Sequence, residues 1–296
     1  MAMRKALSPI YVGEEETGTE ASGAGGNGAR RRKRHIVFGW YGGKFSHLAW
    51  LLPLLPACHH YCEPFSGSGA VLLNRQPSPV ETYNDIDGEV VNFFRALRDQ
   101  PDELTRAIGL TPFSREEFYD AVSPRTETLS DLERARRFFV RARQARTGLA
   151  QTATLGRWAN CKDTSRAGMS GVVSRWLGSI EDLPEIAMRL LRVQIENRPA
   201  VDAIRLYDGP DTLFYCDPPY PHASRGDSKA YGFEMSDREH RELSETLHHC
   251  KGKVAISSYH CDLMDELYSD WRRYDAVPKM CHSIKQMRQE SLWLNY

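Results

Sequence analysis

The pattern of apolar and polar positions in the first hundred residues predicts alternating strands and helices. Short runs at 60–62 and 81–84 have the length and the bounding turn residues of strands. A helix is predicted after each, at 70–74 and again beyond residue 87, where apolar residues recur on one face. Strand, helix, strand and helix in this order predict a parallel sheet.

The same alternation resumes in the last third of the chain. Residues 212–216 form an apolar run that predicts a buried strand, and Ser236 and Glu239 have the spacing of a capping box that begins a helix. The other predicted elements are a helix over 46–55 and strands over 254–258, 274–277 and 291–296. The fold class is therefore α/β.

Residues 101–192 differ in character and are predicted to be a mostly helical insertion in the α/β unit. From 134 to 175 this segment carries ten Lys and Arg residues opposed only by Asp163, with aromatic and glycine residues between them. Such a stretch favours a nucleic-acid-binding face over a merely solvated helical surface. The residues predicted to contact DNA are Arg143, Arg146, Arg157, Lys162 and Arg166.

The first 34 residues are predicted to be a disordered arm. Residues 13–29 show no hydrophobic period, and five basic residues follow at 30–34. The basic cluster has two interpretations, a solvated tail without a role or a non-specific phosphate contact, and the sequence does not decide between them.

Composition argues against general disorder and against a coiled coil. The 296 residues are 41% hydrophobic and 26% charged, with zero formal net charge, which is ordinary for a globular domain. The longest apolar stretch, 48–55, is broken by Pro53, and the sequence begins without the apolar core of a signal peptide, so we expect a cytoplasmic protein without a membrane span.

Cysteine usage points to reduced thiols. The seven cysteines are an odd number spread over a long chain, which is unlike a disulfide framework. The Cys and His groups at 58–62 and 248–250 lack the paired spacing of a zinc site, so no metal is expected.

The first chemical signal is a glycine turn after the strand at 60–62. Phe65, Gly67 and Gly69 are spaced so that backbone can approach a ligand, and Asp85 follows Gly67 by eighteen positions, at the end of the next strand. This arrangement is used to bind a ribose through its hydroxyl groups. The third glycine of the dinucleotide fingerprint is missing, which favours a nucleoside cofactor without a pyrophosphate.

The second signal is the tetrapeptide Asp217-Pro218-Pro219-Tyr220, directly after the apolar run. The two prolines fix the backbone and leave carbonyl groups without local N–H partners. A carboxylate and a fixed carbonyl can then each accept one hydrogen from an NH2 group, while the phenol ring offers a stacking face for a planar base. The alternative is a simple proline turn at a strand end.

Four motifs together resemble a known family. Residues 40–44, Trp-Tyr-Gly-Gly-Lys, look like its W-x-G-G-K motif, and residues 63–69 resemble its E-P-F-x-G-x-G motif. Residues 84–87 are similar to its ribose-binding acid and 217–220 to its catalytic motif. In this order, over about 35–296, they resemble the D12-type (Dam-like) DNA adenine-N6 methyltransferases.

The resemblance implies a Rossmann-like methyltransferase sheet that uses S-adenosyl-L-methionine and acts on double-stranded DNA without a metal. It implies a catalytic domain over 35–100 and 193–296, with target recognition in the inserted 101–192. The implied cofactor-binding residues are Trp40, Lys44, Glu63, Phe65, Gly67, Gly69, Asp85 and Asp217. The implied catalytic residues are Asp217, Pro218, Pro219 and Tyr220, with the carboxylate and the Pro218 carbonyl accepting the N6 hydrogens of a flipped adenine and Tyr220 stacking on it.

Other functions stay open on the sequence. Cytosine N4, an RNA base or a glutamine amide is a chemically adjacent target, although Asp217 in place of Asn favours adenine in DNA. A catalytically inactive nucleic-acid-binding module is a further alternative, against which the intact motifs argue. The recognised DNA sequence, the oligomeric state and a partner restriction endonuclease are not decided by the sequence.

Overall fold

The structure, a computed structural model, describes residues 34–124, 128–146, 148, 150–151, 153–165, 168–224, 232–281 and 286–296. The predicted disordered arm lies outside the described residues, apart from Arg34, and so does Arg166.

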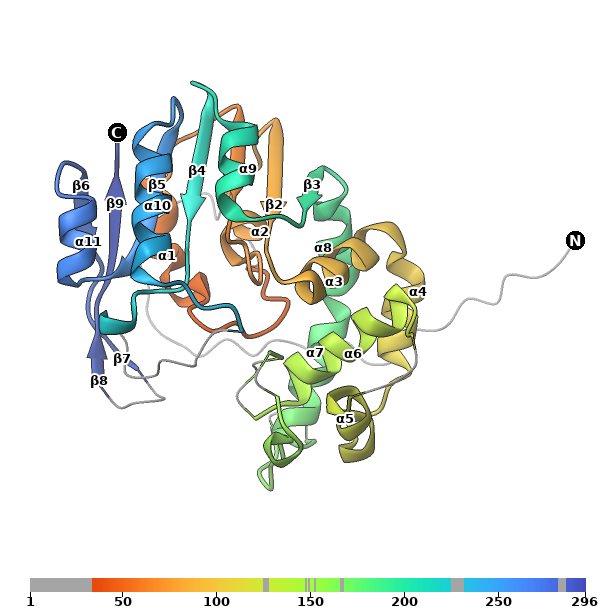
Figure 1. The fold of residues 1–296 in the computed structure, drawn as a ribbon. Coiled ribbons are helices and arrows are strands. Elements are labelled where there is room, and N and C mark those ends of the chain that lie inside the picture. The colour runs from red at the N-terminus through yellow and green to blue at the C-terminus, as the bar shows by residue number, and fades with distance from the viewer. Residues whose placement is uncertain are drawn as a thin grey trace, which may run out of the picture.

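Seven strands of the described chain form one sheet in the order β3-β2-β1-β4-β5-β9-β6 (Figure 1). Neighbouring strands from β3 to β5 are parallel, whereas β9 runs antiparallel to both β5 and β6. The strands are β1 His60–Glu63, β2 Val80–Asn84, β3 Val193–Glu196, β4 Thr212–Cys216, β5 Lys253–Tyr259, β6 Arg272–Asp275 and β9 Glu290–Leu294. This topology confirms the predicted Rossmann-like methyltransferase sheet.

Helices cover both faces of the sheet, and a separate hairpin lies at its lower end in Figure 1. The helices of the α/β unit are α1 Leu48–Leu51, α2 Ala70–Asn74, α3 Gly88–Asp99, α9 Ala200–Tyr207, α10 Asp237–His248 and α11 Asp262–Leu267. The hairpin pairs β7 Lys279–Cys281 with β8 Gln286–Arg288. The predicted capping box of α10 is present, since the Ser236 hydroxyl accepts from the Glu239 N–H and the Glu239 carboxylate accepts from the Ser236 N–H.

The core explains why β4 is apolar throughout. Leu213 and Tyr215 point to the face covered by α1 to α3, while Phe214 and Cys216 point to the face covered by α10 and α11. A strand buried on both faces needs a continuous apolar run rather than an alternating one. This burial fixes the position of the tetrapeptide that follows β4.

The inserted segment is helical and lies on the β3 side of the sheet, at the end where the parallel strands finish (Figure 1). Its helices are α4 Pro101–Gly109, α5 Arg115–Val122, α6 Asp131–Gln144, α7 Gly171–Glu181 and α8 Leu183–Leu190. Phe139 of α6 stacks on Phe93 of α3 with 5.6 Å between ring centroids, and Trp176 of α7 packs on Phe139. The insertion therefore shares one hydrophobic core with α3 instead of forming its own.

Some sequence expectations were wrong in detail. The helix predicted over 46–55 is broken into short 3-10 and α turns, because Pro53 lacks the N–H that a continuous helix would use. The strand predicted at 274–277 begins and ends two residues earlier, at 272–275, where it pairs with β9. The last strand is 290–294 rather than 291–296. Strand β3, helix α9 and the β7–β8 hairpin were not predicted.

Candidate active site

The candidate site lies where the carboxyl ends of β1, β2 and β4 meet the segment at 40–44. One pocket is lined by residues from all four motifs, as expected for ligands at the carboxyl edge of a parallel sheet. Of the predicted cofactor-binding residues, those that line it are Trp40, Lys44, Glu63, Phe65, Gly67, Asp85 and Asp217. Gly69 instead precedes α2, and of the tetrapeptide Asp217 and Pro219 reach the pocket wall.

Gly67 is required by its backbone and by its neighbours. Its φ is +50°, a left-handed conformation that favours glycine, and a Cβ there would lie 2.3 Å from Trp40 Nε1. Its N–H donates to Asp85 Oδ2 at 2.8 Å. The glycine turn thus brings together the indole of the first motif and the acid of the third.

Asp85 is buried and held by backbone donors. The N–H groups of Gly67 and Asp87 donate to its two carboxylate oxygens at 2.8 and 2.9 Å. Burial raises the pKa of Asp85 to about 6, although these N–H groups act in the opposite direction. Each oxygen keeps a lone pair for a further donor, which suits ribose hydroxyl groups.

Glu63 is a second buried acid on the pocket wall. Its Oε1 accepts from the Tyr61 hydroxyl at 2.7 Å. Burial raises the pKa of Glu63 to about 8, despite the opposing effects of Tyr61 and Arg75. Such an acid is suited to receive a ligand ammonium group, which would favour its ionised form. Asp85 and Glu63 together fit a nucleoside that carries an amino acid, as S-adenosylmethionine does.

The Asp217 carboxylate is oriented by side chains from the 3-10 turn at 44–47, from β5 and from its own loop. Lys44 Nζ lies 2.7 Å from both carboxylate oxygens. Oδ1 also accepts from Ser257 of β5 at 2.8 Å, and the Tyr220 hydroxyl oxygen lies 3.2 Å from it. With 18% of its side chain exposed, Asp217 still reaches the pocket, and its remaining acceptor capacity on Oδ2 is available to a substrate hydrogen.

Lys44 is a buried cation, with 3% of its side chain exposed. Besides Asp217, its ammonium donates to the Gly42 carbonyl at 2.6 Å and lies 3.3 Å from Glu290 Oε1. Burial alone would lower the pKa of Lys44, but the carboxylates of Asp217 and Glu290 outweigh it and raise the pKa above its usual value. Lys44 is therefore charged and fixes Asp217.

Glu290 and Ser257 are site residues that the sequence reasoning missed. Glu290 begins β9, is 4% exposed on its side chain and accepts a hydrogen bond from the Tyr220 hydroxyl. Burial, together with the Asp217 charge, raises the pKa of Glu290 even though Lys44 lowers it. The sequence did offer a signal, because an acid stands directly before the strand predicted at 291–296. If the strand begins one residue earlier than predicted, that acid is part of the strand and is buried with it. We call Lys44, Asp217, Tyr220, Ser257 and Glu290 the edge cluster.

Tyr220 does not present an open face in this structure. It is 1% exposed, and its ring packs edge-to-face on Tyr259 with 4.9 Å between centroids. Stacking of Tyr220 on a target base stays a prediction, and it requires the ring to become accessible when the base enters.

Comparison with known proteins decides the family. The family model for the D12 class N6 adenine-specific DNA methyltransferases matches residues 40–289. The chain belongs to this family. The matched range contains every motif of the pocket described above.

Individual relatives agree. The chain is 28% identical over 255 residues to the type II methyltransferase M1.LlaDCHI of Lactococcus lactis subsp. cremoris, covering 78% of this chain and 84% of that protein. It is 25% identical over 245 residues to the DNA N-6-adenine-methyltransferase of Escherichia phage P1, covering 79% of this chain but 31% of the phage protein. A DNA adenine methylase of Vibrio cholerae is 33% identical over 72 residues, 24% of this chain and 25% of the relative.

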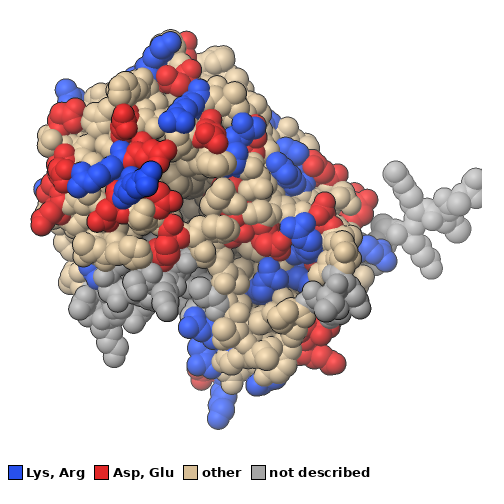
Figure 2. Space-filling model, in the orientation of Figure 1, with Lys and Arg blue, Asp and Glu red and all other residues tan. Residues whose placement is uncertain are grey.

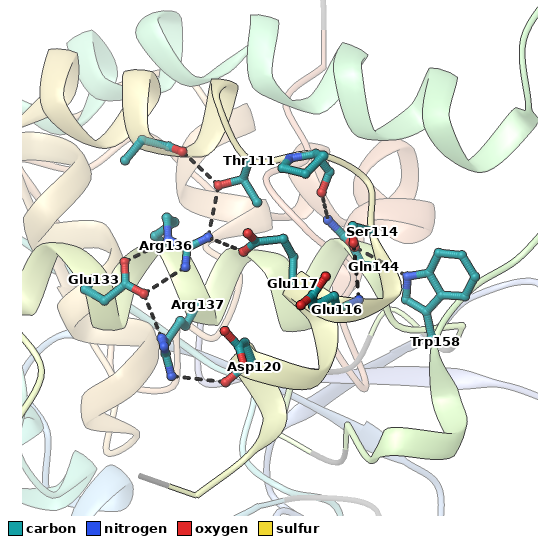
Figure 3. Close-up of polar contacts among 12 residues, drawn as sticks. Thr111, Ser114, Glu116, Glu117, Asp120, Glu133, Arg136, Arg137, Gln144 and Trp158 are labelled. Carbon is teal, nitrogen blue, oxygen red and sulfur yellow. Dashed lines mark hydrogen bonds and ion pairs between the residues drawn. The ribbon is translucent and has the colours of Figure 1, made fainter. Parts of the chain in front are cut away.

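In this D12 methyltransferase, much of the basic segment is turned toward the protein. Arg136 donates to Glu133 and Glu117 at 2.7 and 2.9 Å, and Arg137 donates to Glu133 at 2.7 Å (Figure 3). We call these four residues the α6 network. Arg134 and Arg141 are likewise paired, with Glu89 of α3. The count of basic residues from 134 to 175 therefore overstated the unpaired positive charge, because the acidic partners of these arginines lie before residue 134.

Arg143 also points inward. Its guanidinium donates to the Ile36 carbonyl at 2.7 Å and lies over the Phe139 ring. These contacts favour a role in fastening the 36–38 segment to α6 over a role in DNA contact.

The remaining predicted DNA contacts are on the surface or outside the described residues. Arg146, Arg157 and Lys162 are exposed, whereas Arg166 is not among the described residues. On the face shown in Figure 2, basic and acidic side chains are interspersed. Binding of DNA by Arg146, Arg157 and Lys162 stays a prediction.

Two further observations concern what the described part of the chain lacks. No helix in it is both long and apolar enough to cross a membrane. It also brings together no group of three or more His, Cys, Asp or Glu side chains that could hold a metal ion.

Proposed function

We propose that this adenine-specific DNA methyltransferase binds S-adenosylmethionine in the pocket at the carboxyl edge and uses Asp217 to receive the N6 amino group of a flipped adenine. The observation that carries the proposal is the position of Asp217. Its carboxylate lines the same pocket as Asp85 and Glu63 and is fixed there by Lys44. The acceptor for the substrate is thus built beside the acids that fit the cofactor.

Different pocket residues bind different parts of the cofactor. Asp85 accepts hydrogen bonds from the ribose hydroxyl groups, and Glu63 pairs with the ammonium group of the methionine part. Gly67, which has no side chain, lets the backbone of the glycine turn approach the cofactor closely. When bound, S-adenosylmethionine supplies an electrophilic methyl group on a cationic sulfur.

Asp217 and the Pro218 carbonyl act on the amino nitrogen. The lone pair of N6 is delocalised into the adenine ring, so the nitrogen is a poor nucleophile until its hydrogens are held by acceptors. A carboxylate and a rigid carbonyl favour a pyramidal nitrogen and stabilise the positive charge that develops on it. Fixed positions of both groups also reduce the entropic cost of alignment. Adenine reaches them only if it is rotated out of the duplex.

The inserted 101–192 segment supplies target recognition in this proposal, next to a catalytic domain formed by 35–100 and 193–296. Its position at the end of the sheet where the strands finish supports this, because DNA must lie over that end for a base to enter (Figure 1). Arg146, Arg157 and Lys162 contact phosphates, which position the duplex.

The name of the Lactococcus relative supports a role beside a restriction endonuclease. A methyltransferase in that role modifies every copy of one sequence in the host DNA. Methylation-aware sequencing of plasmid DNA from an expressing strain identifies the site, and scattered or partial methylation would contradict the role.

The decisive experiment replaces Asp217 by Ala. Because a fixed charge-stabilising group is removed, we expect methyl transfer to fall by about 100-fold or more. Transfer of labelled methyl to DNA is measured, followed by digestion and identification of the nucleoside, with cofactor affinity measured by titration calorimetry. Asp217→Asn keeps one acceptor without charge and should lie between Ala and wild type.

The matched control is Asp237→Ala, at an exposed acid on α10. It should leave transfer unchanged. Full activity in Asp217→Ala would overturn the mechanism, and a product methylated on cytosine would overturn the adenine target.

A further inference from the structure

Within the described residues, the edge cluster places two carboxylates around one ammonium group. Lys44 Nζ lies 2.7 Å from both oxygens of Asp217 and 3.3 Å from Glu290 Oε1. All three side chains have little access to solvent, with 3% of Lys44, 18% of Asp217 and 4% of Glu290 exposed. The three residues come from the 3-10 turn at 44–47, the loop after β4 and the start of β9. Their juxtaposition has no part in the mechanism above beyond the hold of Lys44 on Asp217.

Lys44 alone would work against the reaction. An ammonium ion paired at this distance cancels most of the field of the Asp217 carboxylate at any point beyond the pair. Methyl transfer moves positive charge from sulfur onto N6, and a neutral ion pair gives that charge little stabilisation. The position of Lys44 therefore calls for a compensating negative charge.

We propose that Glu290 is a positioning residue that balances the charge of Lys44, so that Asp217 keeps the net negative charge that the reacting nitrogen needs. The inference rests on the proposed function of Asp217. Glu290 acts through Lys44 and Tyr220 and does not itself contact the substrate. Its carboxylate holds the ammonium on one side, while Asp217 remains turned toward the pocket.

Among the described residues, Lys44 is the cation that contacts the Glu290 carboxylate, while Arg288, two positions away, packs on the ring of Tyr259. Tyr220 donates its hydroxyl to Glu290, and Tyr259 lies opposite it on β5. Burial raises the pKa of Tyr215, the nearby phenol on β4, so this group stays neutral. With Asp217 as the second carboxylate, the set carries one positive and two negative charges when Glu290 is ionised.

Protonation of Glu290 should then imitate its replacement by Gln. Burial raises the pKa of Glu290, so it takes up a proton closer to neutral pH than an ordinary glutamate. The rate of the chemical step is expected to fall as the pH is lowered through this range. In Glu290→Gln this acidic limb should be absent, and the rate should stay at the low level.

The experiment measures single-turnover methyl transfer to adenine in duplex DNA over a range of pH, at S-adenosylmethionine concentrations that saturate the enzyme at every pH, with wild type and Glu290→Gln. By analogy with loss of a fixed charge-stabilising group, we expect Glu290→Gln to lower the rate on the order of 10-fold or more, with unchanged affinities for S-adenosylmethionine and DNA. Asp275→Asn, on the neighbouring strand β6, is the control for loss of an acid in this part of the sheet and should retain the wild-type profile. Thermal unfolding establishes that each variant is folded.

A second arm separates charge balance from mere packing. In a Lys44→Met background no ammonium needs balancing, so Glu290→Gln should cost much less of the residual rate there. An equal fold-loss in both backgrounds, wild-type rate in Glu290→Gln, or an acidic limb that persists in that variant would overturn the inference. If Glu290→Gln does not fold, a wild-type rate that is flat toward acid pH would overturn it. Wild type that fails to methylate adenine would instead refute the proposed function.

Discussion

The edge cluster and the α6 network both join acidic to basic side chains, but they balance their charges differently. In the α6 network Glu133 accepts from Arg136 and Arg137, and the hydrogen bond from Arg136, followed by that from Arg137, lowers the pKa of Glu133 to about 2. In the edge cluster two carboxylates share Lys44, and burial raises the pKa of Glu290. The first arrangement satisfies its acids, and the second leaves one acid in excess.

The contrast separates charged groups that stabilise the fold from charged groups that serve the reaction. Groups whose ionised form is favoured in the fold contribute stability, since that stabilisation is absent in the unfolded chain. Groups whose ionised form is disfavoured by burial cost stability when they are charged, and they are retained where a reaction uses their charge. The α6 network belongs to the first kind, and Glu290 of the edge cluster, together with Glu63, belongs to the second.

The two kinds of acid should differ most clearly in the effect of Glu63 on cofactor binding. Its pKa of about 8 means that the free protein holds Glu63 neutral below this pH. A ligand ammonium binds the ionised form, so affinity for S-adenosylmethionine should rise with pH, by about tenfold between about pH 6.5 and about 8. Titration calorimetry across this range measures it, and the difference from Glu63→Gln isolates the contribution of Glu63. Parallel profiles for the two proteins would place Glu63 with the structural acids.

A smaller effect is expected in the α6 network. Glu133→Gln should lower the free energy of unfolding by about 1 kcal/mol, a value kept low because the side chain is partly exposed. The methyl transfer rate should not change. Because the pKa of Glu133 is depressed from 4.5, its stabilisation is present above pH 4.5 and is lost as the pH falls toward about 2. Urea unfolding at several pH values measures this, with exposed Glu116→Gln on α5 as control. A loss of activity without a loss of stability would contradict a purely structural role for the α6 network.

The smallest effect separates Arg157 from Arg143. Exposed Arg157, if it contacts a phosphate, should on replacement by Ala weaken DNA binding a few-fold and reduce the slope of log affinity against log salt by about 1. Arg143→Ala should leave that slope unchanged and lower thermal stability, because its guanidinium holds the Ile36 carbonyl. Fluorescence anisotropy at several salt concentrations checks both. If Arg143→Ala reduced the salt slope and Arg157→Ala did not, Arg143 would be a DNA contact.

The parts of the molecule that follow from local sequence were predictable. The strand at 212–216, the glycine turn and the capping box of α10 each depend on neighbouring residues, and all were predicted in place. Most of the pocket was predictable as well, because parallel strands bring their carboxyl ends to one edge and three of the four motifs stand at the end of such a strand. Local signals thus defined the sheet and most of the pocket wall.

What escaped prediction depends on partners distant in sequence. Glu290 and Ser257 belong to the site only because β5 lies beside β4 and β9 lies beside β5 in the sheet, an order that the sequence does not reveal. The basic segment was misjudged for the same reason, since Glu89 and Glu117 lie outside the window in which its charges were counted. The β7–β8 hairpin carries no alternating pattern that would have indicated two strands.

Strand β9 also imposes an order on how the enzyme is made. It lies between β5 and β6, yet it is synthesised after both, so β6 cannot join the sheet until β9 has left the ribosome and paired with β5. Glu290 arrives on that same strand. A nascent chain can therefore complete the cofactor pocket before Glu290 reaches the reactive centre, and chains that stop before β9 should not methylate DNA.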